Sequence, residues 1–389
     1  MSFSSIPILD LSEARDPATK PAFLDSLRHA LLEVGFLYIK NTGVDDKLIR
    51  EVIEEGRRFF ELPDEKKLEV EMKNAPSFLA DPSAFSFLFF SFPFTTGYSR
   101  LGNEITRFKT DWREQIDLST THPLPAPSDP LYHNLLAPNQ WPDSSYLPRF
   151  RPVYEQYMTQ MGAISMEFIS LVAEAIGLPS KAFERFFDKG QQHKLKIVKY
   201  PDLQELGVEG DEGEGQGASH HRGLQVQNHR GDWVDCPPID GTFVVAIGQG
   251  LEAMTQGVCQ STTHRVLSPA RGSGARYSVP FFQGVSYDAT FESMDVPAHV
   301  KALREEVIRR NGIRQDDIEF TFSKGRWGHL GEATLMNRIK SHPDVGERWY
   351  PALLQKIREE QARNNQVAEE PQGLLKEKPK VSSTPVAAH

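Results

Sequence analysis

Two neighbouring stretches decide the fold of this chain of 389 residues: Thr262-Thr263-His264-Arg265-Val266 and Arg276-Tyr277-Ser278-Val279-Pro280-Phe281-Phe282. Both are short runs rich in β-branched and aromatic residues, a composition typical of strands. A Gly-containing segment separates them, as in a turn between strands. They predict two strands, over 261–267 and 276–282.

Further short strands precede this pair. Residues 194–201 alternate between apolar and polar, and so do residues 223–227 and 233–235, while residues 242–247 form an apolar run. The segment Asn228-His229-Arg230-Gly231-Asp232 predicts a turn between the second and third of these strands. Short strands at this spacing, separated by Gly and Pro turns, predict an antiparallel sandwich or barrel.

Helices are expected around this β-structure. Apolar residues recur at three- and four-residue steps over 18–34, 45–61, 153–177 and 298–311, and a charged helix begins at Pro63. The apolar stripe of 153–177 is interpreted as core rather than as a cofactor site. Strands over 6–11 and 36–39 lie among the N-terminal helices. The polar segment 364–389 is expected to be disordered.

Three features of the strands suggest chemistry. His264 lies inside a predicted strand, where a neutral imidazole can hold a transition metal. Arg276 and Ser278 are two residues apart on the next strand, so they project from one face and offer a seat for a carboxylate. Tyr200, at the end of the 194–201 strand, could donate to the same carboxylate. A structural histidine and a chance Arg-x-Ser are the alternative interpretation.

A resemblance to a known family covers roughly residues 5 to 350. The stretches Gly223–Asn228, Gly241–Val245, Thr263–Pro269 and Arg276–Phe282 are similar to the core of the iron(II)- and 2-oxoglutarate-dependent oxygenases, in the isopenicillin N synthase-like branch. Upstream, Ile6–Leu11, Gly35–Ile39 and Asp111–Gln115 resemble the N-terminal region of that family. Several long motifs in the right order make the resemblance specific.

The resemblance implies a double-stranded β-helix, or jelly roll, in an α+β, mainly β chain with N-terminal and flanking helices. It implies residues 1–150 as the N-terminal region and 151–350 as the oxygenase jelly roll. The implied cofactors are Fe(II), held by two His and one carboxylate, and 2-oxoglutarate as co-substrate. His264 becomes the distal metal ligand, and Arg276, Ser278 and Tyr200 become the residues that bind 2-oxoglutarate.

The implied activity is the oxidation of a small molecule by O2, with hydroxylation, desaturation or ring closure as outcomes. Some members of the family close rings or desaturate without 2-oxoglutarate, but Arg276-x-Ser278 favours its use. The alternative function is a catalytically inactive jelly roll that binds a ligand. A structural zinc site at His220, His221 and His229 is a weaker hypothesis, because no cysteine has ligand spacing.

The chain departs from the family pattern at two places. The family carries His-x-Asp and a long apolar strand after a Gly-rich turn, whereas here Ala218-Ser219-His220-His221-Arg222 runs straight into Gly223. Either His220 or His221 is a ligand and the carboxylate is lost, or the whole segment is absent; the second alignment is favoured. Residues 78–96 form an anomalous insertion rich in Phe, Ser, Leu and Pro. Misplaced exon boundaries would explain both anomalies, and a genuine degenerate oxygenase is the rival hypothesis.

Composition narrows the possible partners and location. The formal net charge is -9, and no Lys/Arg-rich block is present, which argues against a nucleic-acid partner. No run of 18 apolar residues and no secretory leader pattern occur, so no membrane association is expected and the protein is expected to be cytoplasmic. Cys236 and Cys259 indicate a reducing compartment without a disulfide framework.

Overall fold

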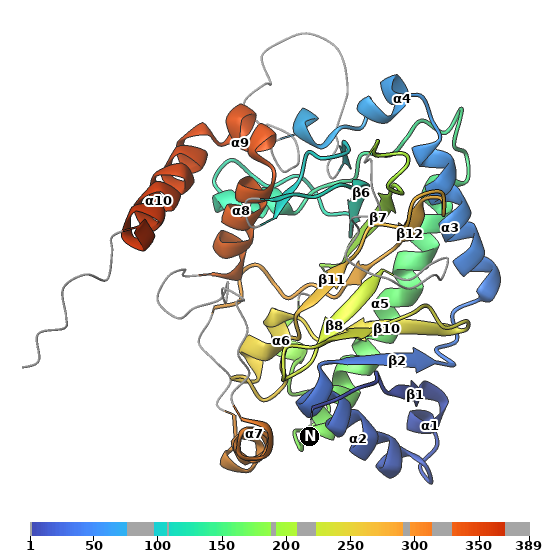
Figure 1. Cartoon of the computed structure of the whole chain (residues 1–389), viewed down its shortest axis with the longest axis vertical. Coiled ribbons are helices and arrows are strands. Elements are labelled where there is room, and N and C mark those ends of the chain that lie inside the picture. The colour runs from blue at the N-terminus through green and yellow to red at the C-terminus, as the bar shows by residue number, and fades with distance from the viewer. Residues whose placement is uncertain are drawn as a thin grey trace, which may run out of the picture.

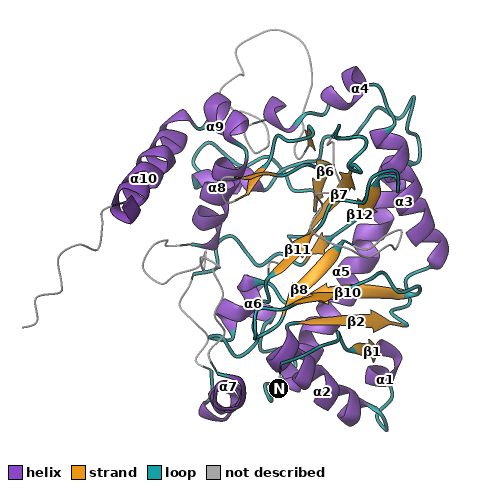
Figure 2. Ribbon diagram, in the orientation of Figure 1, coloured by secondary structure: helices purple, strands orange, loops and turns teal. Residues whose placement is uncertain are grey.

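The computed structural model describes most of the chain. The described residues are 2–75, 97–106, 109–187, 192–207, 223–290, 296–312 and 329–369. Three small sheets lie in the middle of the molecule, and helices surround them (Figures 1 and 2).

The largest sheet is built around β7 (Lys194–Tyr200), which pairs with strands from both ends of the chain. On one edge β7 pairs antiparallel with β6 (Glu114–Ser119), which pairs in turn with β3 (Tyr98–Ser99). On the other edge it pairs antiparallel with β12 (Arg276–Ser278) and β13 (Phe281–Phe282). This sheet therefore joins the N-terminal region to the last strands of the jelly roll.

Two further sheets complete the β-structure. In one, β2 (Phe36–Lys40) lies between β1 (Ile8–Asp10), which is parallel to it, and β10 (Thr242–Ala246), which is antiparallel. In the other, β8 (Leu224–Gln227) lies between β9 (Trp233–Asp235) and β11 (His264–Val266). The short hairpin of β4 (Ile105–Thr106) and β5 (Lys109–Thr110) stands apart.

The helices fall into an N-terminal group, a central helix and a C-terminal group. The described helices are α1 (Leu11–Arg15), α2 (Lys20–His29), the π-helical η1 (Ala30–Val34), α3 (Asp46–Phe60), α4 (Asp64–Leu68), η2 (Met72–Asn74), η3 (Leu131–Leu135), α5 (Phe150–Ala175), η4 (Glu184–Phe186), α6 (Gln249–Met254), α7 (Ala298–Asn311), α8 (Leu330–Ser341), α9 (Pro343–Trp349) and α10 (Pro351–Glu369). In Figure 1, α8, α9 and α10 lie together at one side of the molecule.

The central helix α5 is the main support of the sheets. Its apolar stripe enters two core clusters, one with α2 and β2 and one with α3, β6 and β7. The Tyr154 hydroxyl, fully buried, donates to the carbonyl oxygen of Val52 on α3 at 2.7 Å. The interpretation of this stripe as core is confirmed.

Most of the predicted elements are present. The strands predicted at 6–11, 36–39, 194–201, 223–227, 233–235, 242–247, 261–267 and 276–282 correspond to β1, β2 and β7 to β13, with shorter bounds in places. The turn at Asn228 closes as predicted, with the Asn228 N–H donating to the carbonyl of Asp232 at 2.9 Å. Cys236 and Cys259 are buried free thiols.

Some expectations fall outside the described residues or were incomplete. The Phe-rich segment 78–96 and the loop with His220 and His221 lie outside the described residues. The first residues of the segment expected to be disordered, 364–369, form the end of α10, and the expectation for 370–389 stays a prediction. Strand β6 and helices α8 to α10 were not predicted.

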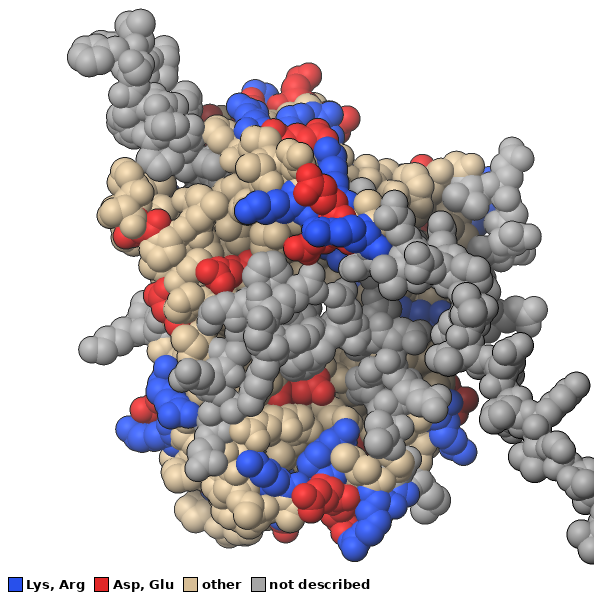
Figure 3. Space-filling model, turned by 90° about the vertical axis from the view of Figure 1, so that its left-hand side faces the viewer, with Lys and Arg blue, Asp and Glu red and all other residues tan. Residues whose placement is uncertain are grey.

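Within the described ranges, none of the helices combines the length and apolar character that crossing a bilayer requires. On the face shown in Figure 3, Lys and Arg side chains are intermixed with Asp and Glu rather than gathered into one basic patch.

A buried histidine predicts loss of stability in acid. His342, between α8 and α9, is 2% exposed, and burial lowers its pKa to about 3. The unfolded chain therefore takes up this proton first, near pH 6.5, so the free energy of unfolding should fall by about 1.4 kcal/mol per pH unit between about pH 6 and 4 from this group alone. Burial lowers the pKa of His193 to about 4, which adds to the effect.

The change His342→Gln should remove its share of that slope. Urea unfolding at pH 7, 6 and 5 measures the slope, and His299→Gln, at an exposed position on α7, is the matched control. An unchanged slope in the His342→Gln protein would show that His342 is not the group that titrates.

Candidate site for a carboxylate co-substrate and a metal

The site begins with the pairing of β7 and β12. Arg276 lies opposite Tyr200, and its guanidinium carbon is 5.3 Å from the centre of the Tyr200 ring. Ser278 lies opposite Val198, two residues along β12, and so projects from the same face as Arg276. The structure thus brings together Tyr200, Arg276 and Ser278, as the sequence predicted.

The side chain of Arg276 is half-buried, and no carboxylate of the described residues is recorded as its ion-pair partner. Burial lowers its pKa, and its Nη1 atom is buried with no hydrogen-bond partner among the described residues. A buried cation without a partner is costly unless an anion is bound beside it, so Arg276 is suited to a ligand carboxylate. The residues present therefore fit one end of a dicarboxylate such as 2-oxoglutarate.

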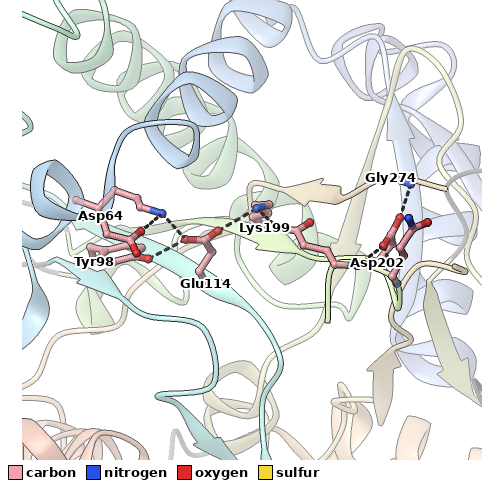
Figure 4. Close-up of polar contacts among 9 residues, drawn as sticks. Asp64, Tyr98, Glu114, Lys199, Asp202 and Gly274 are labelled. Carbon is pink, nitrogen blue, oxygen red and sulfur yellow. Dashed lines mark hydrogen bonds and ion pairs between the residues drawn. The ribbon is translucent and has the colours of Figure 1, made fainter. Parts of the chain in front are cut away.

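A polar clamp fixes the register of Arg276 against Tyr200. Asp202, just after β7, accepts the N–H groups of Glu205, Gln204 and Gly274 at 2.8 to 2.9 Å. These backbone donors lower the pKa of Asp202, and the N–H of Glu205 has the largest effect. Because Gly274 lies two residues before Arg276, this clamp ties the start of β12 to the end of β7 (Figure 4).

The outer face of the same strands carries a chain of buried charges (Figure 4). The Glu114 carboxylate accepts from Tyr98 at 2.7 Å and pairs with Lys67 and Lys199 at 3.2 and 3.1 Å. Glu114 lies opposite Lys199 in the β6–β7 register. The ion pairs therefore reinforce the strand pairing that places Tyr200.

Gly223 connects Arg276 to the sheet that carries His264. A Cβ atom at Gly223 would lie 2.9 Å from the carbonyl oxygen of Leu267 and 3.4 Å from Cδ of Arg276. The carbonyl of Gly223 accepts the N–H of Leu267 at 2.7 Å. Because residue 223 has no side chain, its backbone can lie this close to the Leu267 carbonyl, and the Arg276 side chain lies beside it at ordinary contact distance.

His264 begins β11 opposite Val226, and its side chain is exposed. Its ring packs edge-on against Phe36 with centroids 5.2 Å apart, and Nδ1 is 3.2 Å from the carbonyl oxygen of Thr262. That contact leaves Nε2 as the ring nitrogen that can bind a ligand. The geometry of His264 suits a metal ligand, although within the described residues no contact joins it directly to Arg276.

The approach to His264 depends on Gly35. This residue follows η1 with φ of +70°, and a Cβ atom there would collide with Oγ1 of Thr262. The Thr262 hydroxyl donates to the carbonyl of Val34 at 2.8 Å. The turn before β2 therefore fixes the backbone two residues before His264.

The remaining iron ligands are not found where the structure describes the chain. Within those ranges no group of three or more His, Cys, Asp or Glu side chains could hold a metal ion. The chain contains one His-x-Asp sequence, His342-Pro343-Asp344, but it lies at the α8–α9 junction, where Asp344 accepts from Asn103 at 2.9 Å. His264 alone fits the metal, and a complete triad does not.

The zinc hypothesis receives no support from His229. Its Nε2 lies 2.9 Å from the carbonyl oxygen of Glu33, so the ring is used in packing the turn. His220 and His221 lie outside the described residues.

A row of polar side chains on β6 was missed by sequence reasoning. Gln115, Asp117 and Ser119 alternate with Ile116 and Leu118, a pattern that normally indicates a solvent-facing side, yet all five residues are buried. The resemblance of Asp111–Gln115 to the family was the available signal, but it assigned no role to this face.

Comparison with known proteins identifies the family. Residues 216–285 match the 2OG-Fe(II) oxygenase superfamily, and residues 6–144 match the non-haem dioxygenase in morphine synthesis N-terminal family. The chain is 66% identical over 384 residues to the 2-oxoglutarate-dependent dioxygenase frbJ of Dothideomycetidae sp. (strain 11243), covering 95% of this chain and 99% of the relative. A 2-oxoglutarate-dependent dioxygenase of Gibberella zeae is 35% identical, covering 95% and 97%.

Solved structures show the same fold. A full-length Neurospora crassa protein, solved in complex with alpha-KG, has a TM-score of 0.60 at 22% identity, covering 79% of this chain and 96% of that one. A 2OG-Fe(II) oxygenase family protein of Caulobacter crescentus has a TM-score of 0.60 at 20% identity, covering 87% and 99%. The predicted double-stranded β-helix with helical additions is thereby confirmed.

The family's cofactors are iron and 2-oxoglutarate, and its members are oxidoreductases. The match to frbJ spans nearly the whole of both chains at high identity. This chain therefore belongs to the 2-oxoglutarate- and iron(II)-dependent oxygenases.

Proposed function

We propose that this protein binds 2-oxoglutarate at Arg276 and that its intact form oxidises a small molecule with O2. The observation that carries the proposal is the half-buried Arg276 guanidinium, whose Nη1 atom is out of water and has no hydrogen-bond partner among the described residues. An arginine fork matches the two oxygens of a carboxylate, and exclusion of water strengthens the contact.

Ser278 and Tyr200 complete the proposed carboxylate seat. Ser278 projects from the same face of β12 as Arg276, and its hydroxyl can donate to one carboxylate oxygen. Tyr200 lies opposite Arg276 and can present its hydroxyl from the neighbouring strand. Together they orient the bound carboxylate.

His264 is the proposed distal metal ligand. Bound iron would supply the activation of O2 in this family. This chain contributes the imidazole on β11, but the described residues form no group of three or more His, Cys, Asp or Glu side chains that could complete a metal site. The proposed activity therefore belongs to a form of the protein that has the missing ligands.

We attribute the missing ligands to a segment that is absent before Gly223. The alignment with frbJ is 384 positions long, but it includes only 95% of the 389 residues of this chain. Some aligned positions are therefore occupied in the relative and empty in this chain. In the described residues β10 pairs only with β2, β12 only with β7 and β11 only with β8. Unpaired strand edges of this kind are expected when strands are absent from a closed jelly roll.

The change Arg276→Ala should weaken 2-oxoglutarate binding at least tenfold, because it removes the proposed bidentate partner of the carboxylate. Isothermal titration calorimetry on the full chain measures the dissociation constant. Arg265→Ala is the matched control, since Arg265 lies on neighbouring β11 and bonds to Gln225 at 2.9 Å instead. Equal loss in both proteins would contradict the assignment.

The change His264→Ala should abolish any residual Fe(II) binding by this chain while leaving 2-oxoglutarate binding within about twofold of wild type. Anaerobic Fe(II) titration measures the effect, with His229→Ala as control. Unchanged Fe(II) affinity in the His264→Ala protein would show that His264 is not a ligand.

The transcript should differ from this sequence at two places. Sequencing across codons 70 to 100 and 210 to 225 should reveal a His-x-Asp with an apolar strand, and no Phe-rich segment. A transcript identical to the present chain would instead support the alternative function, an inactive jelly roll that binds a ligand without turnover.

A further inference from the structure

Two strands of the jelly roll have a free edge in the part of the chain that the structure describes. β10 pairs only with β2, and β12 pairs only with β7. No strand of the described residues lies along the other edge of either one. A free edge presents a row of N–H and C=O groups that can pair with another chain.

The hydrogen-bond pattern identifies the groups that β10 presents at its free edge. The Ile247 N–H donates to the carbonyl of Gly35 at 2.9 Å, so Ile247 and every second residue before it face β2. Val244 and Ala246 alternate with these residues, and their N–H and C=O groups therefore point away from β2. Both residues are exposed, Val244 at 39%, so this edge is open.

The same reasoning identifies the free groups of β12. The Lys196 N–H donates to the carbonyl of Pro280 at 3.0 Å, and the β7–β12 register continues in step from that pair to Arg276. Those alternate residues of β12 face β7, so the N–H and C=O groups of Tyr277 and Val279 point to the free edge. No hydrogen bond from a described residue reaches these groups.

Both free edges belong to one layer over the helices. Phe243 of β10 and Tyr277 of β12 pack against the same core cluster, which α3 and α5 build with Leu195 and Ile197 of β7. The ring centroid of Tyr277 lies 6.2 Å from that of Phe60 on α3. β10 and β12 therefore lie on the same helical surface, although none of the described strands joins them.

The second sheet faces this layer from the other side. Phe36 and Tyr38 of β2 pack against Val226 of β8, and a Cβ atom at Gly223 would lie 3.4 Å from Cδ of Arg276. A strand placed between β10 and β12 would thus have the helices on one side and β8 on the other. It would need apolar side chains toward the helices and small ones toward β8.

Neither edge carries the charges or prolines that protect exposed edges in natural sheets. Residues 242–247 and 277–279 contain no Lys, Arg, Asp, Glu or Pro, and most of them are β-branched or aromatic. A partner strand without charges therefore matches both edges, because pairing would leave no charge buried without a counter-charge.

We propose that the two edges form a slot that accepts one extended segment of another protein, uncharged and with apolar residues at alternate positions. Its N–H and C=O groups pair with Val244 and Ala246 on one side and with Tyr277 and Val279 on the other. The inserted strand joins the sheet of β1, β2 and β10 to the sheet of β12, β7, β6 and β3. Binding in the slot needs neither iron nor 2-oxoglutarate, so its failure and the failure of the proposed function are separate results.

The probe is a fluorescently labelled peptide in which valine alternates with threonine between terminal lysines. The control peptide has N-methylated valines, which keep the side chains and remove the donors along one edge. Anisotropy titration of the full chain gives each Kd, and hydrogen exchange followed by mass spectrometry reports protection of residues 242–247 and 276–282. Val244→Pro removes one N–H of the free edge and no bond of the β2 ladder, and Val244→Thr is the matched control.

The wild-type chain should bind the probe and show slower exchange in both segments, because the inserted strand pairs with both edges. N-methylation of the probe and Val244→Pro should each raise the Kd about tenfold, whereas Val244→Thr should leave it within about twofold. Thermal unfolding shows whether Val244→Pro is folded. The N-methylated peptide tests the same contact on the wild-type chain if that variant is not.

Three results would overturn the proposal. They are a wild-type chain that does not bind the probe, equal Kd values for the two peptides, and protection of one segment alone, which would indicate pairing at a single edge. Protection of both segments without peptide, increasing with protein concentration, would show that a second copy of this chain fills the slot instead.

Discussion

The pairing of β7 with β6 and β12 is the constraint on which the rest of the structure depends. The β6–β7 register runs without a break from Glu114↔Lys199 to Ser119↔Lys194, and β12 and β13 occupy the other edge. One strand thereby joins residues from the first third of the chain to the last strands of the jelly roll. The N-terminal region is therefore an integral part of the fold, because its strands β3 and β6 form one edge of the sheet that carries Arg276.

The two faces of this sheet meet opposite demands. Leu195 and Ile197 of β7 are fully buried against α3 and α5, which anchors the sheet by apolar burial. The other face holds Gln115 and Asp117, which are buried, and Arg276, whose Nη1 atom is out of water. Apolar burial on one face thus anchors the sheet, whereas the other face carries polar side chains, among them Arg276, which we propose binds 2-oxoglutarate.

The sequence predicted those parts of the fold that follow local periodicity. Strands such as β7 and β12 alternate or carry β-branched and aromatic residues, and the stripe of α5 repeats at helical steps, so both could be read directly. The pairing of Tyr200 with Arg276 followed from the family resemblance, because spacing along the chain does not reveal which strands are neighbours.

The elements that were missed have physical reasons. The sequence of β6 predicts a strand with one face in solvent, because Gln115, Asp117 and Ser119 are polar. Only the three-dimensional packing shows that this polar face is buried. Helices α8 to α10 form a separate core cluster with Tyr132 and Tyr287 from distant segments. The departure from the His-x-Asp pattern was visible in the sequence because it is a matter of residue order, which needs no structure.

The close contact between Gly35 and Thr262 has a consequence for how this protein could change over time. Any side chain at residue 35 would collide with the backbone that delivers His264, although more than 200 residues separate the two along the chain. The N-terminal and C-terminal halves of the chain are therefore complementary in shape at this contact. A chimera that took its N-terminal half from a distant relative would keep the imidazole of His264 in place only if that relative also has glycine at the position of Gly35.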